Sequence, residues 1–499
     1  MPIPREILEV KRPKNTVVCA YGKDKNRYSV RQRTGCKYDH GRRIPVTGKT
    51  IGHIVDGKYV PNEERDEKQR VSHSPIDLKD WANIMLCDSL FRDILRDLKR
   101  WYNEKDALSV YCIAILRVCH PGIKNCELKE AYETGFLSEI YPGVALSKNT
   151  VSSLLNHLGK SCSVIASFMR ERAGIVNEDH HLLVDGTLKT NDSKVNSLSD
   201  FSRKAKTKGR RDISVLFAFD LEAMEPICSK CFPGNMLDFT SYEAFLSENG
   251  ITKGLVVGDK GFPSSAVEPY MESHPGLHYL NPIKRNSRLI ETHHLLEHTG
   301  ILPEYDGITY RKEKCRDKDK WLYSFRDARK AAKEEQDWLS RAKKNGSYSI
   351  DEFRKKQATF GVIVLESDLD MPPEVVYKAY ESRWEIELVM RFYKSACEFD
   401  ETRVHDDYSV IASEFCDFLS TLLTFRIIKR FDQIKLLDRM SYKKIMSILR
   451  RAKKVKWGSN EWCMVRTSPS HMDILQKLDL LPTPAPMPKK RGRPKKSVV

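Results

Sequence analysis

Two aspartates stand at the ends of apolar runs, where their carboxylates could take part in chemistry. Asp185 follows the run LLV, and Asp259 follows the run LVVG. Both runs are typical of buried strands, and open α/β sheets place their ligand sites beyond the carboxyl ends of such strands. The sequence therefore predicts two carboxylates at strand ends. Each could instead simply open a turn, because Asp-Gly and Asp-Lys-Gly are common turn sequences.

A third acidic residue, Glu387, lies in a segment with helical periodicity, EVVYKAYESRWEIELVMRFYKSA. At about 100° per residue it shares one helix face with four other residues: Tyr380, Arg383, Arg391 and Lys394. Apolar residues occupy most other directions, so the sequence predicts a largely buried helix with one charged stripe. Unpaired buried ions are costly, so the stripe needs partners. A metal ion for the carboxylate and phosphates for the cations would supply them, and solvent or internal salt bridges would do so equally well.

The same segment carries a resemblance to a known family. The run YESRWEIELVMRFYK fits the pattern Y-x2-R-x3-E-x6-K at Tyr380, Arg383, Glu387 and Lys394. This is the YREK signature of DDE transposases of bacterial and archaeal insertion sequences, in the insertion-sequence-four superfamily. VDGT around Asp185 and VVGDKGF around Asp259 resemble the segments of that family's two catalytic aspartates, and FPGNMLD between them resembles its GN-x-x-D stretch. The similarity spans about residues 180 to 400.

The resemblance implies a catalytic site built on three carboxylates. Asp185, Asp259 and Glu387 would be the catalytic residues of a ribonuclease H-like core and would bind two divalent metal ions, Mg²⁺ or Mn²⁺ in its place. Two ions held by hard carboxylate oxygens can activate a water or a 3′-hydroxyl nucleophile and stabilise the leaving oxygen of a phosphodiester. No covalent protein nucleophile is then required.

Two groups of residues are predicted to contact DNA. The resemblance implies that Arg383 and Lys394 hold the DNA backbone beside the cut, with Tyr380 assisting. The C-terminal run KKRGRPKK contains the central motif of an AT-hook at Arg491, Gly492, Arg493 and Pro494. Glycine lets such a backbone lie deep in a narrow minor groove, and the two arginines extend along the negative floor of A·T tracts. A generic basic tail is the alternative.

The periodicity of the remaining sequence predicts the elements that position these residues. Strand-like runs between residues 180 and 262, with the helix around Glu387, describe a mixed α/β core. The predicted fold class is α/β: a ribonuclease H-like core with a β-rich insertion, flanking helical regions and a disordered basic C-terminal tail. The predicted regions are 1–75, small, basic and with strand-like runs; 76–175, helical and DNA-binding; 176–275 with 360–400, the catalytic core; 276–359, the insertion; 401–480, helical; and 481–499, the AT-hook-like tail.

One helix of the region 76–175 has the pattern of a DNA-reading helix. In ALSKNTVSSLLNHLG, Ser147 is the predicted N-cap, and an apolar face follows at Val151, Leu154, Leu155 and Leu158. The polar residues Lys148, Asn149 and His157 could face DNA. An ordinary amphipathic helix explains the pattern at least as well.

Composition indicates which kind of partner and which cellular compartment to expect. The 499 residues include 85 Lys and Arg against 68 Asp and Glu, a net charge of +17, which favours a polyanionic partner such as nucleic acid. Apolar runs of the roughly 18 to 20 residues that a membrane span needs are missing, and the start MPIPREILEVK lacks the apolar core of a signal peptide. We therefore expect a cytoplasmic protein associated with DNA and not with membranes.

These observations favour a DNA transposase that binds the ends of its own element, cuts beside them and joins the 3′ ends to a target. Its partner would be double-stranded DNA, both element ends and target, and it would act on DNA as a homodimer. A nuclease of the same fold that cuts without joining is one alternative. A DNA-binding protein descended from a transposase, with catalysis lost, is another.

Overall fold

The computed structural model describes residues 3–22, 26–39, 41–62, 76–202, 209–236, 238–258, 264–316, 318–383, 399–458 and 460–481. The chain divides into two compact units. The first comprises Met1–Leu78 with Lys454–Met464, and the second comprises Lys79–Lys453 with Val465–Val499. Each unit is described by itself below.

The N-terminal unit contains a four-stranded antiparallel sheet in the order β1-β2-β3-β4. Its small core joins Val18, Val30 and Ile54, and Ile7 of helix α1 packs against them. A second small sheet has the order β16-β15-β5, so two short strands interrupt the helical region predicted for residues 401–480. The elements are α1 (Arg5–Glu9), β1 (Thr16–Tyr21), β2 (Arg27–Asp39), β3 (Arg42–Val55), β4 (Lys58–Pro61), β5 (Ile76–Asp80), β15 (Lys453–Trp457) and β16 (Cys463–Met464).

The second unit is built on a nine-stranded sheet in the order β11-β12-β13-β14-β10-β9-β6-β7-β8. β7 pairs antiparallel with both β6 and β8, whereas β9 and β10 run parallel to β6. Almost every side chain of β7 is buried, as expected for a strand covered on both faces. The predicted mixed α/β class is therefore confirmed. The strands are β6 (His181–Thr190), β7 (Asp212–Asp220), β8 (Glu225–Pro233), β9 (Lys253–Val257) and β10 (Gly276–Pro282).

The segment predicted as an insertion, 276–359, does not form a separate sheet. β10 pairs in parallel with β9, and β14 pairs antiparallel with β10, so the sheet continues through β13 and β12 to β11. The buried Leu277, Tyr279 and Leu280 of β10 explain its place in the core sheet. The further elements are α9 (Asp238–Glu248), α10 (Ser264–Glu272), α11 (Arg288–Thr292), β11 (Gly300–Ile301), β12 (Ile308–Lys314), β13 (Trp321–Asp327), α12 (Ala328–Asn345), α13 (Ile350–Gln357) and β14 (Val362–Ser367).

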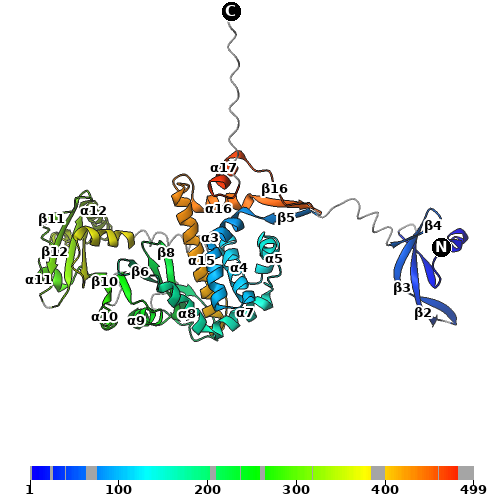
Figure 1. Ribbon diagram of the computed structural model, residues 1–499, viewed down its shortest axis with the longest axis horizontal. Helices are drawn as coiled ribbons and strands as arrows, with labels where there is room; N and C mark the ends of the chain where they lie inside the picture. Colours follow the sequence, from blue (N-terminus) through cyan, green and yellow to red (C-terminus); the bar gives the residue numbers. More distant parts are fainter. Residues whose placement is uncertain are drawn as a thin grey trace, which may run out of the picture. The chain divides into compact units, whose positions relative to one another are not determined.

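A bundle of helices packs around α15 (Asp407–Gln433), beside α3 and α4 (Figure 1). α15 is buried around most of its circumference and also contacts β8, so it joins the helices to the sheet. Among the helices of the described ranges, none is long and apolar enough to cross a membrane. The other helices are α3 (Ala82–Trp101), α4 (Glu104–Cys119), α5 (Leu128–Glu133), α6 (Leu137–Ile140), α7 (Lys148–Lys160), α8 (Cys162–Ala173), α16 (Tyr442–Arg451) and α17 (Pro469–Lys477).

Helix α7 has the predicted cap and the predicted apolar face. Ser147 is its N-cap, and the Ser147 side chain accepts a hydrogen bond from the Thr150 N–H at 3.2 Å. The apolar face is buried against α15. The two helices approach closely at Gly159, where an added Cβ would lie 1.9 Å from the Tyr408 carbonyl oxygen. Only a residue without a side chain fits at this position.

Replacing Gly159 by Ala is expected to lower the free energy of unfolding by about 1 to 3 kcal/mol, because the added methyl group forces α7 away from α15. Thermal unfolding followed by circular dichroism measures this effect. Ser153→Ala on the exposed side of the same helix is the matched control and should leave the midpoint unchanged. Equal midpoints for the two variants would contradict the close approach.

Candidate active site

Asp185 lies within β6 rather than at its end. β6 pairs with β7 from Leu182↔Asp220 to Thr190↔Asp212, so the strand continues five residues beyond Asp185. The prediction of a strand end and the alternative of a turn are therefore both wrong. The apolar run does stop at Val184, but Thr187 and Lys189 still point inward and are buried.

The neighbouring strand β9 ends close to Asp185. Among the described residues, the parallel pairing of β6 with β9 stops at Leu183↔Val257. Asp185 thus lies just beyond the carboxyl end of β9, half exposed, with Oδ1 accepting a hydrogen bond from the Gly186 N–H at 2.8 Å. The carboxyl end of a parallel strand is the usual position of ligand sites in α/β sheets.

The other two predicted carboxylates, Asp259 and Glu387, lie outside the described residues. The same holds for Lys394 and for the predicted AT-hook residues Arg491, Gly492, Arg493 and Pro494. Of the predicted catalytic and metal-binding residues, the described part of the chain contains Asp185.

Tyr380 and Arg383 lie in a helix that the structure describes over residues 373–383. The Arg383 side chain is buried, and its guanidinium carbon lies 5.2 Å from the centroid of the Tyr380 ring. This distance suits a cation–π contact, which strengthens when the cation is desolvated. One turn earlier, Tyr377 packs against Phe325 of β13, so the helix is held beside the outer part of the sheet. The two signature residues described by the structure therefore contact each other.

A buried cluster of four charges joins β6 to the helices. The Lys189 ammonium donates to Glu414 Oε2 at 2.6 Å and to Asp417 Oδ2 at 2.8 Å. Arg117 of α4 donates to Asp417 Oδ1 at 2.7 Å. Two cations and two anions leave the cluster neutral, and all four side chains are buried. Because a buried charge without a partner is very costly, these contacts hold β6, α4 and α15 in one arrangement.

The pKa values of this cluster follow from burial and from its opposite charges. Burial alone would lower the pKa of Lys189, but the carboxylates of Asp417 and Glu414 outweigh it, and the pKa is raised. Burial raises the pKa of Glu414, although Lys189 opposes this effect. The opposite charges therefore favour the protonated ammonium of Lys189, and the contact with Lys189 opposes the rise that burial causes in the pKa of Glu414.

The residues after 398 are fixed to the carboxyl end of β6. The Thr190 N–H donates to the Asp400 carbonyl oxygen and the Thr402 N–H donates to the Thr190 carbonyl oxygen, both at 3.0 Å. The Asn191 side chain donates to the carbonyl oxygens of Thr402 and Val404, each at 2.9 Å. The segment that follows the predicted Glu387 helix is thus anchored five residues after Asp185 on the same strand.

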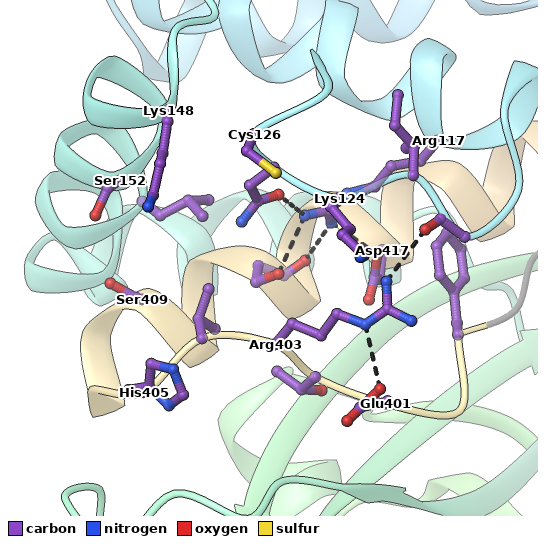
Figure 2. Close-up of a pocket in the computed structure, with 18 of the residues that line it drawn as sticks. Arg117, Lys124, Cys126, Lys148, Ser152, Glu401, Arg403, His405, Ser409 and Asp417 are labelled. Atoms are coloured by element: carbon purple, nitrogen blue, oxygen red, sulfur yellow. Dashed lines mark hydrogen bonds and ion pairs between the residues drawn. The ribbon is translucent and has the colours of Figure 1, made fainter.

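A cavity of about 480 Å³ lies between this segment, α7 and the loop after α4 (Figure 2). Lys124, Lys148 and Arg403 line it. Arg403 is held by Glu401 at 3.2 Å and by the Gly122 carbonyl oxygen at 3.1 Å. The buried pair Arg117 and Asp417 also lines the cavity, so two members of the charge cluster described above form part of its wall. Sequence reasoning missed this cavity because its walls come from segments far apart in the chain.

His180, Asp220 and Glu222 have ligand atoms within 4.8 Å of one another, the spacing of a metal site. These atoms already have protein partners. His180 Nδ1 lies 2.7 Å from Asp220 Oδ2, and Asp220 Oδ1 accepts hydrogen bonds from the backbone N–H groups of Glu222 and Ala223. Glu222 pairs with His181. The group closes the turn after β7, at the end of β6 away from the β9 carboxyl end.

The described mixed sheet thus places the half-exposed carboxylate of Asp185 just beyond the carboxyl end of the parallel strand β9. Residues 177–410 match the protein family described as "Transposase DDE domain". A comparison with curated proteins gave no match. Among solved structures, the chain is similar to the piggyBac transposase of a synaptic complex with hairpin DNA, with 13% identity over 76% of this chain and 82% of that chain and a TM-score of 0.37.

Proposed function

We propose that this protein is a DNA transposase that cleaves DNA strands with the help of divalent metal ions and joins the 3′ ends of an insertion sequence to a target. The match of residues 177–410 to the transposase DDE domain carries the proposal. Within this domain, the four matches to the YREK pattern favour the insertion-sequence-four superfamily: Tyr380, Arg383, Glu387 and Lys394.

The strand arrangement supports a ribonuclease H-like core. Five neighbouring strands have the order β8-β7-β6-β9-β10. β7 pairs antiparallel with both β6 and β8. β9 and β10 lie on the other side of β6 and run parallel to it. This order and these directions are those expected of a ribonuclease H-like sheet.

The strand register supports a shared site for Asp185 and Asp259. Leu183 pairs with Val257, 74 residues further along the chain, and the same 74 residues separate the two aspartates. Neighbouring strands lie about 4.8 Å apart. A register that continues for two residues would therefore bring the two carboxylates together, which agrees with a common function.

The donor chemistry at Asp185 fits a hard divalent cation. Its carboxylate is half exposed just beyond the carboxyl end of the neighbouring parallel strand β9, and carboxylate oxygens are the ligands that Mg²⁺ prefers. We propose that Asp185, Asp259 and Glu387 hold two such ions, with Mn²⁺ able to replace Mg²⁺. When bound, the ions would activate the attacking oxygen and stabilise the leaving oxygen.

The remaining signature residues would position DNA. Arg383 is held against the Tyr380 ring, so its orientation is restricted before a phosphate arrives. Together with Lys394 it would hold the DNA backbone beside the cut. On α7, Lys148 and His157 are exposed, as a further DNA contact requires. We propose that the chain binds element ends and target as double-stranded DNA and does so as a homodimer.

The test of this function uses the purified full-length chain, Mg²⁺, DNA carrying the inverted repeats that flank the gene, and a plasmid target. We expect strand cleavage at the repeats and covalent joining of the 3′ ends to the plasmid. Cleavage without joining would instead identify a nuclease. DNA binding with neither reaction, in Mg²⁺ or Mn²⁺, would identify a DNA-binding protein that has lost catalysis.

Deleting residues 482–499, which lie outside the described residues, is expected to lower the affinity for A·T-rich DNA and to leave the thermal midpoint unchanged. The tail's cations contribute a salt-dependent term, and Arg491 and Arg493 add a preference for narrow minor grooves. Electrophoretic mobility shifts with A·T-rich and G·C-rich duplexes measure both effects. A tail with Gly492→Ala and Pro494→Ala keeps the charge, and an unchanged A·T preference in that variant would refute the AT-hook.

A further inference from the structure

The two long strands of the N-terminal unit extend beyond the rest of their sheet. β1 pairs with β2 over Arg27–Gln32, and β4 pairs with β3 over Gly52–Val55. Beyond these ranges β2 and β3 pair with each other, ending at Asp39↔Arg42. We call the outer parts of the two strands, residues 33–39 of β2 and 42–47 of β3, the basic arm (Figure 1 shows β2 and β3). It is a two-stranded ribbon.

The strand pairing at the base of the basic arm is irregular, and the side chains of the arm do not form a hydrophobic core. Register shifts mark β2 between Val30 and Gly35, and such bulges bend a strand and increase its twist. No described side chain of the basic arm is buried, whereas Val30 at its base is fully buried. Tyr38 is 75% exposed. A two-stranded ribbon without a core gains little stability by itself, so the basic arm contributes little to the fold.

The basic arm carries positive charge on both faces. Arg33 donates a hydrogen bond to Cys36 Sγ, and this bond, together with Arg43, lowers the pKa of the Cys36 thiol. Both arginines therefore lie on the Cys36 side. Lys37, the next residue, points to the opposite face. Where side chains are described, Arg33, Lys37 and Arg43 have no carboxylate within ion-pair distance.

The shape and charge of the basic arm suit a polyanion that has a groove wide enough to admit a two-stranded ribbon. The major groove of double-stranded DNA is about 12 Å wide and admits such a ribbon. Cations on both faces of an inserted ribbon can reach the phosphates on both sides of the groove, and exposed apolar side chains such as Tyr38 and Ile44 can contact base edges.

We propose that the basic arm binds double-stranded DNA by entering its major groove. The arm belongs to the N-terminal unit and shares no residue with the transposase DDE domain. The choice of DNA as partner rests on the proposed function, but the groove contact does not depend on catalysis. Binding measured in EDTA therefore tests the arm even if the chain proves unable to cleave DNA.

The experiment compares two full-length variants that each lose four exposed positive charges from the N-terminal unit. The arm variant is R33A/K37A/R42A/R43A, and the control variant is R5A/K11A/K14A/K58A. Binding to a 30-base-pair duplex is measured in EDTA at several salt concentrations. Protection of guanine N7 from dimethyl sulfate, measured in parallel, reports on the major groove, because N7 lies there.

The arm variant should bind the duplex at least tenfold more weakly near 50 mM salt, with the slope of log affinity against log salt reduced by about 3 to 4. It should also lose guanine N7 protection. The control variant should change affinity less than threefold and keep the protection. Both variants should unfold at the wild-type temperature, because neither set of side chains is buried.

Three results would overturn the proposal. Equal losses in the arm and control variants would show a general charge effect. Wild-type protection of guanine N7 in the arm variant would place the contact outside the major groove. An equal loss of binding to single-stranded DNA or to anionic lipid vesicles would show that the basic arm recognises charge without recognising the duplex.

Discussion

Asp185→Asn is expected to lower the rate of DNA cleavage at least about a thousandfold, the largest effect of any substitution considered for this chain. The amide keeps the size of the side chain but removes the negative charge that a divalent ion requires. A loss of about 4 kcal/mol of transition-state stabilisation corresponds to this factor, and metal ions supply several kcal/mol. Cleavage of end-bearing DNA in Mg²⁺, measured under single-turnover conditions, gives the rate.

DNA affinity should be unchanged in the Asp185→Asn variant, because binding comes mainly from cations elsewhere in the chain. Glu222→Gln is the matched control: it removes one carboxylate charge from the group His180, Asp220 and Glu222. We expect it to cleave at the wild-type rate. Full activity of the Asp185 variant together with an inactive Glu222 variant would show that the active site lies at the other end of β6.

Lys189→Met is expected to lower the free energy of unfolding by about 3 to 5 kcal/mol, the range for removing one member of a buried ion pair. It leaves Glu414 and Asp417 buried with Arg117 as their remaining cation. Urea unfolding measures the loss. The double variant Lys189→Met/Glu414→Gln restores neutrality and should recover most of the stability. A double variant no more stable than Lys189→Met would show that packing of the lysine stem, not charge, stabilises this site.

The loss caused by Lys189→Met should be smaller at pH 5 than at pH 8. Burial raises the pKa of Glu414, and the variant removes the lysine that opposes this rise. A carboxyl group whose pKa is raised by folding contributes stability below its unfolded pKa and loses that contribution as the pH rises through the folded value. Protonation of Glu414 at low pH therefore relieves the unpaired charge. A loss independent of pH would exclude Glu414 as the group responsible.

Local patterns in the sequence sufficed for much of the fold. The run LLV at the start of β6, the run DISVLFAFD of β7 and the run EPICSKCF of β8 could be recognised as strands because their apolar residues favour burial. The spacing of Val151, Leu154 and Leu158 correctly placed the buried face of α7, since helical periodicity depends only on nearby residues. The YREK pattern and the net charge can likewise be read without tertiary information, and residues 177–410 match the family described as "Transposase DDE domain".

The surroundings of Asp185 depended on residues distant in the sequence. The local sequence cannot distinguish a strand that ends at Asp185 from one that continues to Thr190, because a lysine such as Lys189 is usually exposed to solvent. Only Glu414 and Asp417, more than 220 residues away, make the burial of Lys189 favourable and let β6 continue. The position of β10 beside β9 also depends on residues that are distant in the sequence, because the two strands pair only after a connection that includes α10. Burial of a charge is set by its partners, and partners from distant segments meet only in the folded chain.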